Sequence, residues 1–317
     1  MTGTRRCVVL DDYQGVALEY AAWSRLAGVE TSAVREHLGG DDLVAALAGA
    51  EVVVAMRERT GFDAALLDRL PDLRLLVTTG RRNPSIDLDA CRERGITVCA
   101  TSARATPTVE LTWALVLGLA RRLVPESRAL ATGEWQTTVG TDLAGSTLGV
   151  VGLGRIGSRV AALGRAFDMD VVAWSPHLTA ERAADAGVRA VDRDELLATA
   201  DVVTLHLVLA ASTRGTIGAA ELAAMRPTAY LVNTARAGLV DTGALLAALD
   251  AGTIAGAGLD VHDEEPLPAG HPVRTHPRVL ATPHLGYVTE RNYRTFFSGA
   301  VEDVEAWLAG HPVRVLT

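Results

Sequence analysis

The sequence has few cysteines and no long apolar run. Its three cysteines, Cys7, Cys91 and Cys99, form no C-x-x-C pair, and an odd number fits a reducing cytosol. The first apolar run, residues 7–10, is far too short for a signal peptide and ends in two aspartates. The most apolar long segment, residues 109–120, contains a glutamate and is shorter than a membrane span. We therefore expect a soluble, cytoplasmic protein with no membrane partner.

The sequence also lacks an excess of basic charge. Its 38 acidic residues outnumber its 30 Lys and Arg residues, the net charge is −8, and no long basic run is present. This balance argues against nucleic acid as a partner. Hydrophobic residues make up 49% of the chain and charged residues 21%, as in an ordinary globular protein. A length of 317 residues predicts about two domains, with a core that needs neither disulfides nor a metal to fold.

Short apolar runs alternate with helical patterns along the whole chain. Continuous Val, Leu and Ile runs are typical of parallel strands covered on both faces, so the alternation predicts a doubly wound α/β fold. We expect a first series of strands at 7–10, 51–56, 73–80 and 96–101, with helices at 41–50 and 63–70. We expect a second series at 147–154, 170–175, 201–207, 229–235, 254–261 and 278–285, with helices at 194–200, 219–226 and 242–252. An apolar helix at 107–123 should cross between the domains, and a terminal helix at 289–310 should return to the first.

A glycine-rich turn follows the first strand of the second series. Its spacing is Gly152-x-Gly154-x-x-Gly157, directly after an apolar strand and at the start of a helix, as a dinucleotide-binding loop requires. Gly152 permits the tight turn, Gly154 lets the backbone approach a pyrophosphate, and Gly157 allows close packing of the helix on the strand. The N–H groups at this helix start, with Arg155 and Ile156 between the glycines, would bind the anion.

The next helix and strand bear on how the cofactor is held. The helix is expected to face the sheet with an apolar stripe formed by Ile156, Val160, Leu163 and Phe167. The strand after it ends at Ser175, where a dinucleotide site usually has an acid for the adenine ribose hydroxyls. A serine does not repel a 2′-phosphate, so the choice between NAD(H) and NADP(H) stays open, with NAD favoured.

Three polar side chains follow strands of the second series. Arg236 follows the strand at 229–235, Glu265 lies just past the strand at 254–261, and His284 lies near the end of the last strand. Because parallel strands end at one edge of a sheet, we expect these side chains in one cleft. A guanidinium binds a carboxylate bidentately, and an imidazole oriented by a carboxylate can give a proton to a carbonyl oxygen. The set predicts hydride transfer between a nicotinamide and C2 of a 2-oxo acid.

The acidic segment 258–271 raises a different interpretation. Its carboxylates and imidazoles, together with two histidines further along the chain, suggest a metal site built from His262, His271, His276 and His284. No pair of these histidines has the H-x-x-x-H spacing, and Pro266, Pro268 and Pro272 interrupt the loop that carries them, so we expect no metal. Asp263 and Glu264 are expected to be solvated, and His262 and His271 to be ordinary loop histidines.

Four segments together resemble the D-isomer-specific 2-hydroxyacid dehydrogenases, the family of phosphoglycerate dehydrogenase and glyoxylate/hydroxypyruvate reductase. They are "TLGVVGLGRIG", "LVNTARAGLVDTGAL", "GAGLDVHDEEPLP" and "TPHLGYVT", and the resemblance covers nearly the whole chain. It implies that Arg236 binds the substrate, that His284 is the acid/base with Glu265 as its partner, and that Asp260 lies near the nicotinamide carboxamide. We also place His206 and Ala235, at the ends of two strands, among the cofactor-binding residues.

The resemblance also implies an architecture. A flavodoxin-like substrate domain, residues 1–101 and 286–317, flanks a Rossmann cofactor domain, residues 102–285. Backbone N–H groups around Thr79, Gly80 and Arg81 would hold the substrate carboxylate. The family implies a homodimer built through the cofactor domains, in which an arm carries Trp135 toward the partner's active site. Three positions depart from the family pattern: Ser175, Val208 in place of a proline, and Ala237 in place of a glycine.

Four arginines of the first domain bear on the substrate. Arg57 and Arg59 follow one predicted strand, and Arg81 and Arg82 follow another. If one or two of them face the cleft, with Arg57 the first candidate, the substrate carries a second anionic group, a phosphate or a carboxylate. Otherwise they are solvated surface charges.

A non-catalytic interpretation stands beside the enzymatic one. The family resembled here includes corepressors that bind a dinucleotide without turning over a substrate. The presence of Arg236, Glu265 and His284 favours an enzyme, and turnover of 2-oxo acids by the protein separates the two alternatives.

Overall fold

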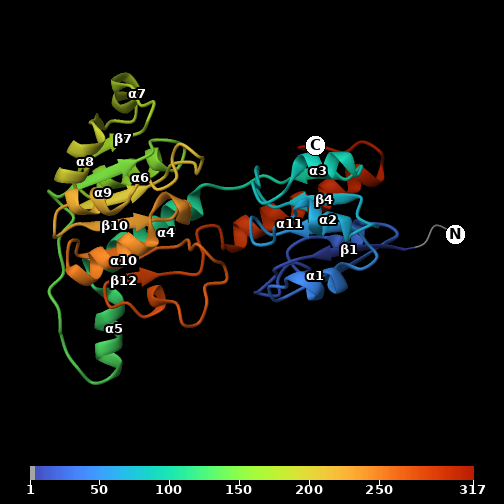
Figure 1. Ribbon diagram of the computed structural model, residues 1–317, viewed down its shortest axis with the longest axis horizontal. Helices are drawn as coiled ribbons and strands as arrows, with labels where there is room; N and C mark the ends of the chain where they lie inside the picture. The colour runs from blue at the N-terminus through green and yellow to red at the C-terminus, as the bar shows by residue number, and fades with distance from the viewer. Residues whose placement is uncertain (1–3) are drawn as a thin grey trace. The chain divides into compact units, whose positions relative to one another are not determined.

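The computed structural model describes residues 4–317, which form two compact units (Figure 1). Unit 1 contains the chain up to Arg104 together with Thr289–Thr317, and unit 2 is Ala105–Val288. These boundaries lie slightly later in the chain than the 101/102 and 285/286 expected above. In the described part of the chain, no helix is long and apolar enough to cross a bilayer.

Unit 1 is built on a five-stranded parallel sheet. Its strand order is β2-β1-β3-β4-β5, which is the doubly wound order of flavodoxin-like folds. The strands are β1 (Arg5–Val9), β2 (Val29–Ala33), β3 (Ala50–Ala55), β4 (Leu75–Thr78) and β5 (Thr97–Ala100). The helices are α1 (Gly40–Leu47), α2 (Ala64–Asp68), α3 (Leu88–Glu93) and the terminal α11 (Glu290–Leu308), with a 3₁₀ turn η1 (Trp23–Arg25). Helix α11 packs on β4 and β5, which brings the last part of the chain back to this sheet.

Unit 2 is built on a seven-stranded parallel sheet of order β12-β11-β10-β9-β6-β7-β8. The strands are β6 (Thr147–Val151), β7 (Asp170–Trp174), β8 (Arg189–Ala190), β9 (Val202–Leu205), β10 (Tyr230–Asn233), β11 (Gly256–Leu259) and β12 (Val279–Ala281). The helices are α4 (Thr106–Ala120), α5 (Leu123–Ala131), α6 (Gly157–Ala166), α7 (Ala180–Asp185), α8 (Arg193–Thr199), α9 (Ala219–Ala224) and α10 (Thr242–Ala251), with 3₁₀ turns η2 (Ala237–Leu239) and η3 (Pro272–Arg274). The predicted doubly wound α/β class is confirmed in both units.

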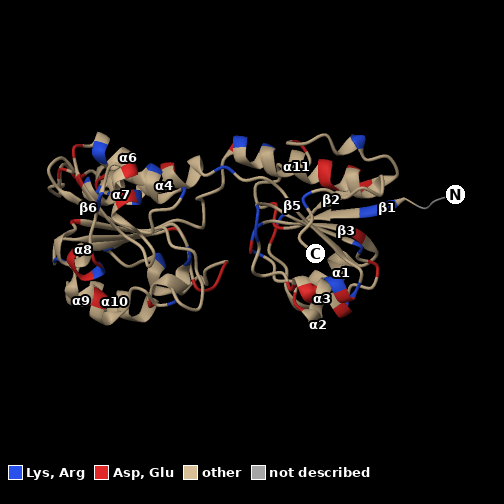
Figure 2. Ribbon diagram, turned by 90° about the horizontal axis from the view of Figure 1, so that it is seen from above, with Lys and Arg blue, Asp and Glu red and all other residues tan. Residues whose placement is uncertain are grey.

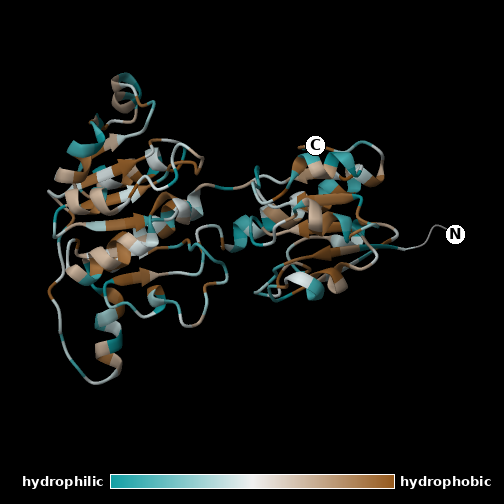
Figure 3. Ribbon diagram, in the orientation of Figure 1, coloured by the Kyte–Doolittle hydropathy of each residue, from teal (hydrophilic) through white to brown (hydrophobic). Residues whose placement is uncertain are grey.

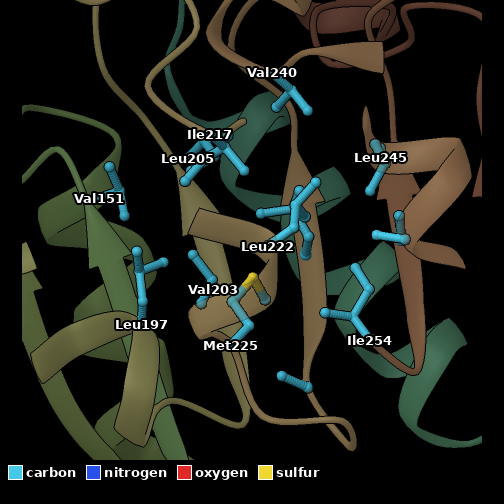
Figure 4. Packing of buried hydrophobic residues seen from close by; sticks show 14 of the residues in the cluster. Val151, Leu197, Val203, Leu205, Ile217, Leu222, Met225, Val240, Leu245 and Ile254 are labelled. Carbon is cyan, nitrogen blue, oxygen red and sulfur yellow. The ribbon is translucent and has the colours of Figure 1, made fainter. Parts of the chain in front are cut away.

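Each central strand of unit 2 buries both of its faces. Val203 and Leu231 belong to one apolar cluster, whereas their neighbours Val202 and Val232 belong to another on the opposite side of the sheet. Figure 4 shows part of the first cluster, with Val203 and Leu205 of β9, Leu222 of α9 and Leu245 of α10 labelled. Charged residues lie mostly on helices and loops, and the central strands are apolar (Figures 2 and 3). Burial on both faces explains why these strands read as continuous apolar runs.

Two strands of the structure were not predicted. Strand β2 lies at the edge of its sheet, and its residues are exposed or half-buried, so it carries no apolar run. Strand β8 has only two residues and lies at one edge of the seven-stranded sheet. Neither strand has a fully buried residue, so neither carries the apolar run that revealed the other strands.

The prediction for the helix after the glycine turn was wrong at two positions. Leu163 is 40% exposed and Phe167 is 38% exposed, and α6 packs on the sheet through Val160, Ala161 and Gly164. A Cβ at Gly164 would lie 2.6 Å from Leu148 Cδ2, so the buried Leu148 side chain would have to shift to admit one. The helix approaches the sheet too closely for large residues.

The long apolar helix also ends earlier than predicted. Helix α4 ends at Ala120, because Arg122 has a left-handed φ of 52°, and α5 starts directly afterwards. Helix α4 lies wholly within unit 2 and packs on β10 and β11, so it does not cross between the units.

Candidate active site

An acid and an imidazole meet after two neighbouring strands of unit 2. Glu265 follows β11 and His284 follows β12, and Glu265 Oε2 lies 2.6 Å from His284 Nδ1. The other carboxylate oxygen, Oε1, accepts a hydrogen bond of 2.9 Å from the backbone N–H of His262. The two side chains are 16% (His284) and 26% (Glu265) exposed, so both are half-buried. Nδ1 is occupied by the carboxylate, which leaves Nε2 of His284 as the ring nitrogen for chemistry.

The environment of Glu265 keeps its carboxyl ionised. Burial acts to raise the pKa of Glu265, but the hydrogen bond and charge of His284, with the His262 N–H, outweigh it and hold the pKa below its ordinary value. An ionised carboxylate only accepts hydrogen bonds, so Nδ1 of His284 is the donor. The pair is therefore set up to stabilise a positive charge on the ring.

The backbone of His284 is held in an unusual conformation. Its φ is +54°, in the left-handed region that residues other than glycine seldom adopt. Asp260, at the end of β11, fixes the segment on both sides of His284. Its Oδ1 accepts from Thr282 Oγ1 at 2.7 Å and from the Leu285 N–H at 2.6 Å, and its Oδ2 accepts from the Gly286 N–H at 2.8 Å. These contacts hold the strained loop that presents the imidazole.

Asp260 is completely buried, and both of its oxygens are engaged within unit 2. Burial raises the pKa of Asp260, and the hydrogen bonds from residues 282–286 and the charge of His284 oppose that rise. The sequence interpretation placed this side chain beside a nicotinamide carboxamide. In the structure, its contacts are with the His284 segment.

Arg236 lies just past the strand next to β11. It directly precedes η2, and its Nη1 donates to the Ala235 carbonyl at 2.6 Å. The buried side chain of Asn233 holds this turn: Nδ2 donates to the Arg236 carbonyl at 2.9 Å, and Oδ1 accepts from the Ala235 N–H at 3.0 Å. Arg236, Glu265 and His284 thus follow three adjacent parallel strands, β10, β11 and β12, at one edge of the sheet. Sequence reasoning missed Asn233, whose place at the end of β10 was the available signal.

The glycine turn has the shape that a dinucleotide needs. Gly152 has φ +105°, and a Cβ there would lie 2.7 Å from the His206 backbone. A Cβ at Gly157 would lie 2.1 Å from the Gly152 carbonyl oxygen, so both glycines are required by packing. A Cβ at Gly154 would meet nothing within 4 Å. The middle glycine therefore borders open space at the start of α6, which leaves room for a pyrophosphate.

Two polar side chains lie beside this turn. Ser175, past the end of β7, accepts a hydrogen bond of 3.0 Å from the Leu153 N–H, so it ties the strand end to the turn. His206, after β9, has Nε2 3.0 Å from Thr204 Oγ1, and its backbone N–H donates to the Val151 carbonyl at 2.7 Å. Burial lowers the pKa of His206 to about 3, so its ring is neutral at physiological pH.

The remaining histidines of the metal interpretation have structural contacts. His262 Nε2 lies 3.0 Å from the Thr282 carbonyl, His271 accepts from the Val273 N–H at the start of η3, and His276 lies 3.2 Å from Asp250. Within residues 4–317, no group of three or more His, Cys, Asp or Glu side chains is arranged to hold a metal ion. Asp263 and Glu264 are exposed, as predicted.

The expected carboxylate-binding residues of unit 1 make hydrogen bonds within that unit. The N–H of Thr79 donates to the Ala55 carbonyl at 3.0 Å, and the N–H of Gly80 donates to Thr101 Oγ1 at 2.9 Å. These two N–H groups have acceptors within unit 1, and the assignment of this segment to a substrate carboxylate stays a prediction. The group that lies against Gly80 is the Arg57 guanidinium, whose Nη1 also donates to the Thr79 carbonyl at 3.2 Å. Arg81 is exposed.

Comparison with known proteins shows which family the chain belongs to. Residues 113–286 match the family model of the NAD-binding domain of D-isomer-specific 2-hydroxyacid dehydrogenases. The glyoxylate reductase of Aeropyrum pernix is 38% identical over 258 residues, which are 78% of this chain and 77% of that protein. The D-3-phosphoglycerate dehydrogenase of Archaeoglobus fulgidus is 33% identical over 94% of this chain but only 57% of its own length. The chain therefore spans little more than half of that relative.

A solved structure extends the likeness to the whole fold. The phosphoglycerate oxidoreductase of Vibrio cholerae superimposes with a TM-score of 0.92 at 36% identity, over 96% of this chain and 99% of that one. The predicted family resemblance is thus confirmed. The chain belongs to the D-isomer-specific 2-hydroxyacid dehydrogenases and is an oxidoreductase that uses a nicotinamide dinucleotide.

Proposed function

We propose that this protein interconverts a small 2-oxo acid and its D-2-hydroxy acid, with His284 as the acid/base. The observation that carries the proposal is the contact of 2.6 Å between Glu265 Oε2 and His284 Nδ1. In the reducing direction, Nε2 of His284 gives a proton to the carbonyl oxygen, and Glu265 stabilises the charge on the ring. A bound nicotinamide supplies the hydride to C2. In the oxidising direction, Nε2 takes the hydroxyl proton.

Substrate binding is assigned to an arginine of unit 2 and to residues of unit 1. Arg236 would pair with the substrate carboxylate, because a guanidinium fork matches two carboxylate oxygens and stays charged. From unit 1 we propose Arg57, with the 79–81 segment of Thr79, Gly80 and Arg81 that it contacts. Arg57 would provide the charge there, since two backbone N–H groups of that segment are already bonded.

The dinucleotide would lie along the carboxyl edge of the unit 2 sheet. Gly154 leaves room for the pyrophosphate, and the start of α6 offers N–H groups to it. The residues assigned to the cofactor are Gly152, Gly154, Arg155, Ile156, Gly157, Ser175, His206, Ala235 and Asp260. Ser175 does not repel a 2′-phosphate, but no arginine directly follows β7 to bind one. We therefore propose NAD(H) as the preferred cofactor, with measurable use of NADP(H).

We further propose a homodimer formed through unit 2. Helix α5 has no buried residue, and it extends from the rest of its unit together with the loop that follows (Figure 1). Leu130 is 60% exposed, Trp135 76% and Val139 96%. Large apolar side chains gathered on one segment favour an interface, and a second copy of the chain would cover them.

A panel of 2-oxo acids tests the function directly. Oxidation of NADH and NADPH is followed with glyoxylate, hydroxypyruvate, a phosphorylated 2-oxo acid and oxaloacetate. We expect turnover of at least one acid, with a higher kcat/KM for NADH than for NADPH. If the protein binds a dinucleotide tightly but turns over none of these acids, the proposal is overturned and the non-catalytic alternative is favoured.

A further inference from the structure

The loop after β3 places two opposite charges next to each other. Arg57 Nη2 lies 3.5 Å from Glu58 Oε1, and the two side chains are only 16% and 15% exposed. Arg57 itself has a left-handed φ of 54°, so the backbone turns sharply between strand and loop. The pair is largely withdrawn from water, where a charge interaction is screened less than at the surface.

The position of the Arg57 guanidinium is set by the loop after β4. Its Nη1 donates to the Thr79 carbonyl at 3.2 Å, and the Arg57 backbone N–H donates to Thr79 Oγ1 at 2.9 Å. A Cβ on Gly80 would lie 1.9 Å from Nη1, so the absence of a side chain at Gly80 makes room for the guanidinium. Asn83 Nδ2 adds a hydrogen bond of 2.6 Å to the Arg57 carbonyl. Arg57 is therefore held in one place, with the Glu58 carboxylate beside it.

The other three arginines that follow β3 and β4 have different surroundings. Arg59 Nη1 donates to the Asp11 carbonyl at 2.8 Å, and its guanidinium stacks 4.3 Å from the centre of the Tyr13 ring. Arg81 and Arg82 are exposed to solvent, where a single charge is worth little. Of the four arginines that follow β3 and β4, Arg57 is thus the half-buried cation whose guanidinium lies beside a carboxylate, that of Glu58.

We infer that Glu58 is a specificity-determining residue that compensates the charge of Arg57. It selects a 2-oxo acid whose remaining substituent is uncharged, and it discriminates against a phosphate or a second carboxylate. An added anion beside Arg57 meets the like charge of Glu58, and repulsion of this kind separates similar substrates. The inference rests on the proposed function, in which Arg57 takes part in substrate binding.

The test compares hydroxypyruvate with 3-phosphohydroxypyruvate and oxaloacetate in wild type and Glu58→Gln. The wild type is expected to have a kcat/KM at least about 10-fold higher for hydroxypyruvate than for either dianionic acid. Glu58→Gln keeps the size of the side chain and removes its charge, so the ratio of dianionic to monoanionic kcat/KM should rise by about 10-fold or more. In Glu58→Gln combined with Arg57→Gln, that gain should vanish, because the uncompensated cation is gone. Glu58→Ser gives the same comparison if the glutamine variant does not fold.

The matched control is Glu93→Gln. Glu93 also follows this pattern of an adjacent arginine, 3.9 Å from Arg94, but it is 78% exposed. This variant changes the net charge equally and should leave the substrate ratio unchanged. A ratio unchanged in both Glu58 variants, an equal rise in Glu93→Gln, or a wild type that prefers the phosphorylated acid would each overturn the inference. Absence of turnover with all acids in the wild type would instead overturn the proposed function.

Discussion

At the residue scale, the candidate chemistry depends on two side chains that lie nineteen positions apart in the chain. Glu265 has a lowered pKa, because the hydrogen bond and charge of His284 outweigh the effect of burial. It therefore orients the imidazole as a fixed anion. His284 has a left-handed backbone that Asp260 holds on both sides. The strained residue and its two acidic neighbours form one structural group, with the reactive nitrogen left unoccupied by either acid.

The first prediction concerns the imidazole itself. His284→Ala should lower kcat by ~10²-fold or more while leaving the Kd for NADH nearly unchanged, which is the usual scale for loss of a general acid. Steady-state kinetics and a fluorescence titration with NADH measure the two quantities. His311→Ala, which changes an exposed histidine of unit 1, is the control and should keep the wild-type kcat. A near-wild-type kcat in His284→Ala would refute the assignment.

A second residue-scale prediction concerns stability and pH. Asp303 in α11 is fully buried, and burial raises its pKa to about 6 despite the Arg314 guanidinium 2.9 Å away. The folded state thus binds the proton more tightly than the unfolded state, whose carboxyl has a pKa near ~3.9. The contribution of this group to the free energy of unfolding should fall as pH rises from about 4 to about 6, by about 3 kcal/mol at most.

Urea unfolding of wild type and Asp303→Asn between pH 4 and pH 7 measures this contribution. The stability difference, wild type minus variant, should decrease with rising pH across that window. Glu302→Gln alters a second acid that contacts Arg314 but is 56% exposed, and it should show no such slope. A pH-independent difference for Asp303→Asn would mean that the buried carboxyl does not titrate in this range.

At the element scale, the loops that follow parallel strands carry the site, and helices position those loops. Helix α6 packs closely on the sheet through small residues. This packing positions the first turn of α6 next to the end of β6. The glycines of the turn therefore have separate roles. Gly152 and Gly157 satisfy packing within unit 2, whereas Gly154 borders open space.

The third prediction uses this difference between two glycines. Gly157→Ala places a methyl group against the Gly152 carbonyl oxygen and should destabilise the protein by about 2 kcal/mol, as overpacking does. Gly154→Ala should leave the Tm nearly unchanged but weaken NADH binding by about 10-fold, because the methyl group fills the space needed by the pyrophosphate. Thermal unfolding and calorimetric titration measure the two effects. The assignment fails if Gly154→Ala binds NADH as tightly as the wild type.

At the scale of the whole molecule, one apolar segment has no cover within the described chain. The exposed residues of α5 and the loop after it belong to unit 2, the unit that carries the glycine turn, Glu265 and His284. Coverage by a second copy is the explanation we propose for this surface.

The fourth prediction is that this surface holds a dimer. Leu130→Glu combined with Trp135→Glu should produce a monomer in light scattering at micromolar concentration, because each change puts a charge into an apolar interface. Leu18→Glu changes a residue of unit 1 that is 46% exposed and should leave the assembly unaltered. A wild type that is already monomeric would contradict the proposal.

The sequence alone was sufficient to predict the central strands and the glycine turn. The central strands of both sheets are continuous apolar runs because they are covered on both faces, and the glycine spacing follows from packing against backbone atoms. The edge strand β2 and the face of α6 were not predictable in the same way. The residue types of β2 and α6 depend on what packs against each element. The periodicity of a sequence does not report the distance between a helix and a sheet.

The identities of Arg236, Glu265 and His284 as candidates were determined by the sequence, since each follows an apolar run that ends at a common edge. Only the tertiary structure decided what their neighbours do. It showed that Asp260 holds the His284 segment, that the Thr79 and Gly80 N–H groups already have acceptors, and that Glu58 lies beside Arg57. The physical reason is that a hydrogen-bond partner depends on distances of a few ångströms between segments far apart in the chain, and residue order does not specify those distances.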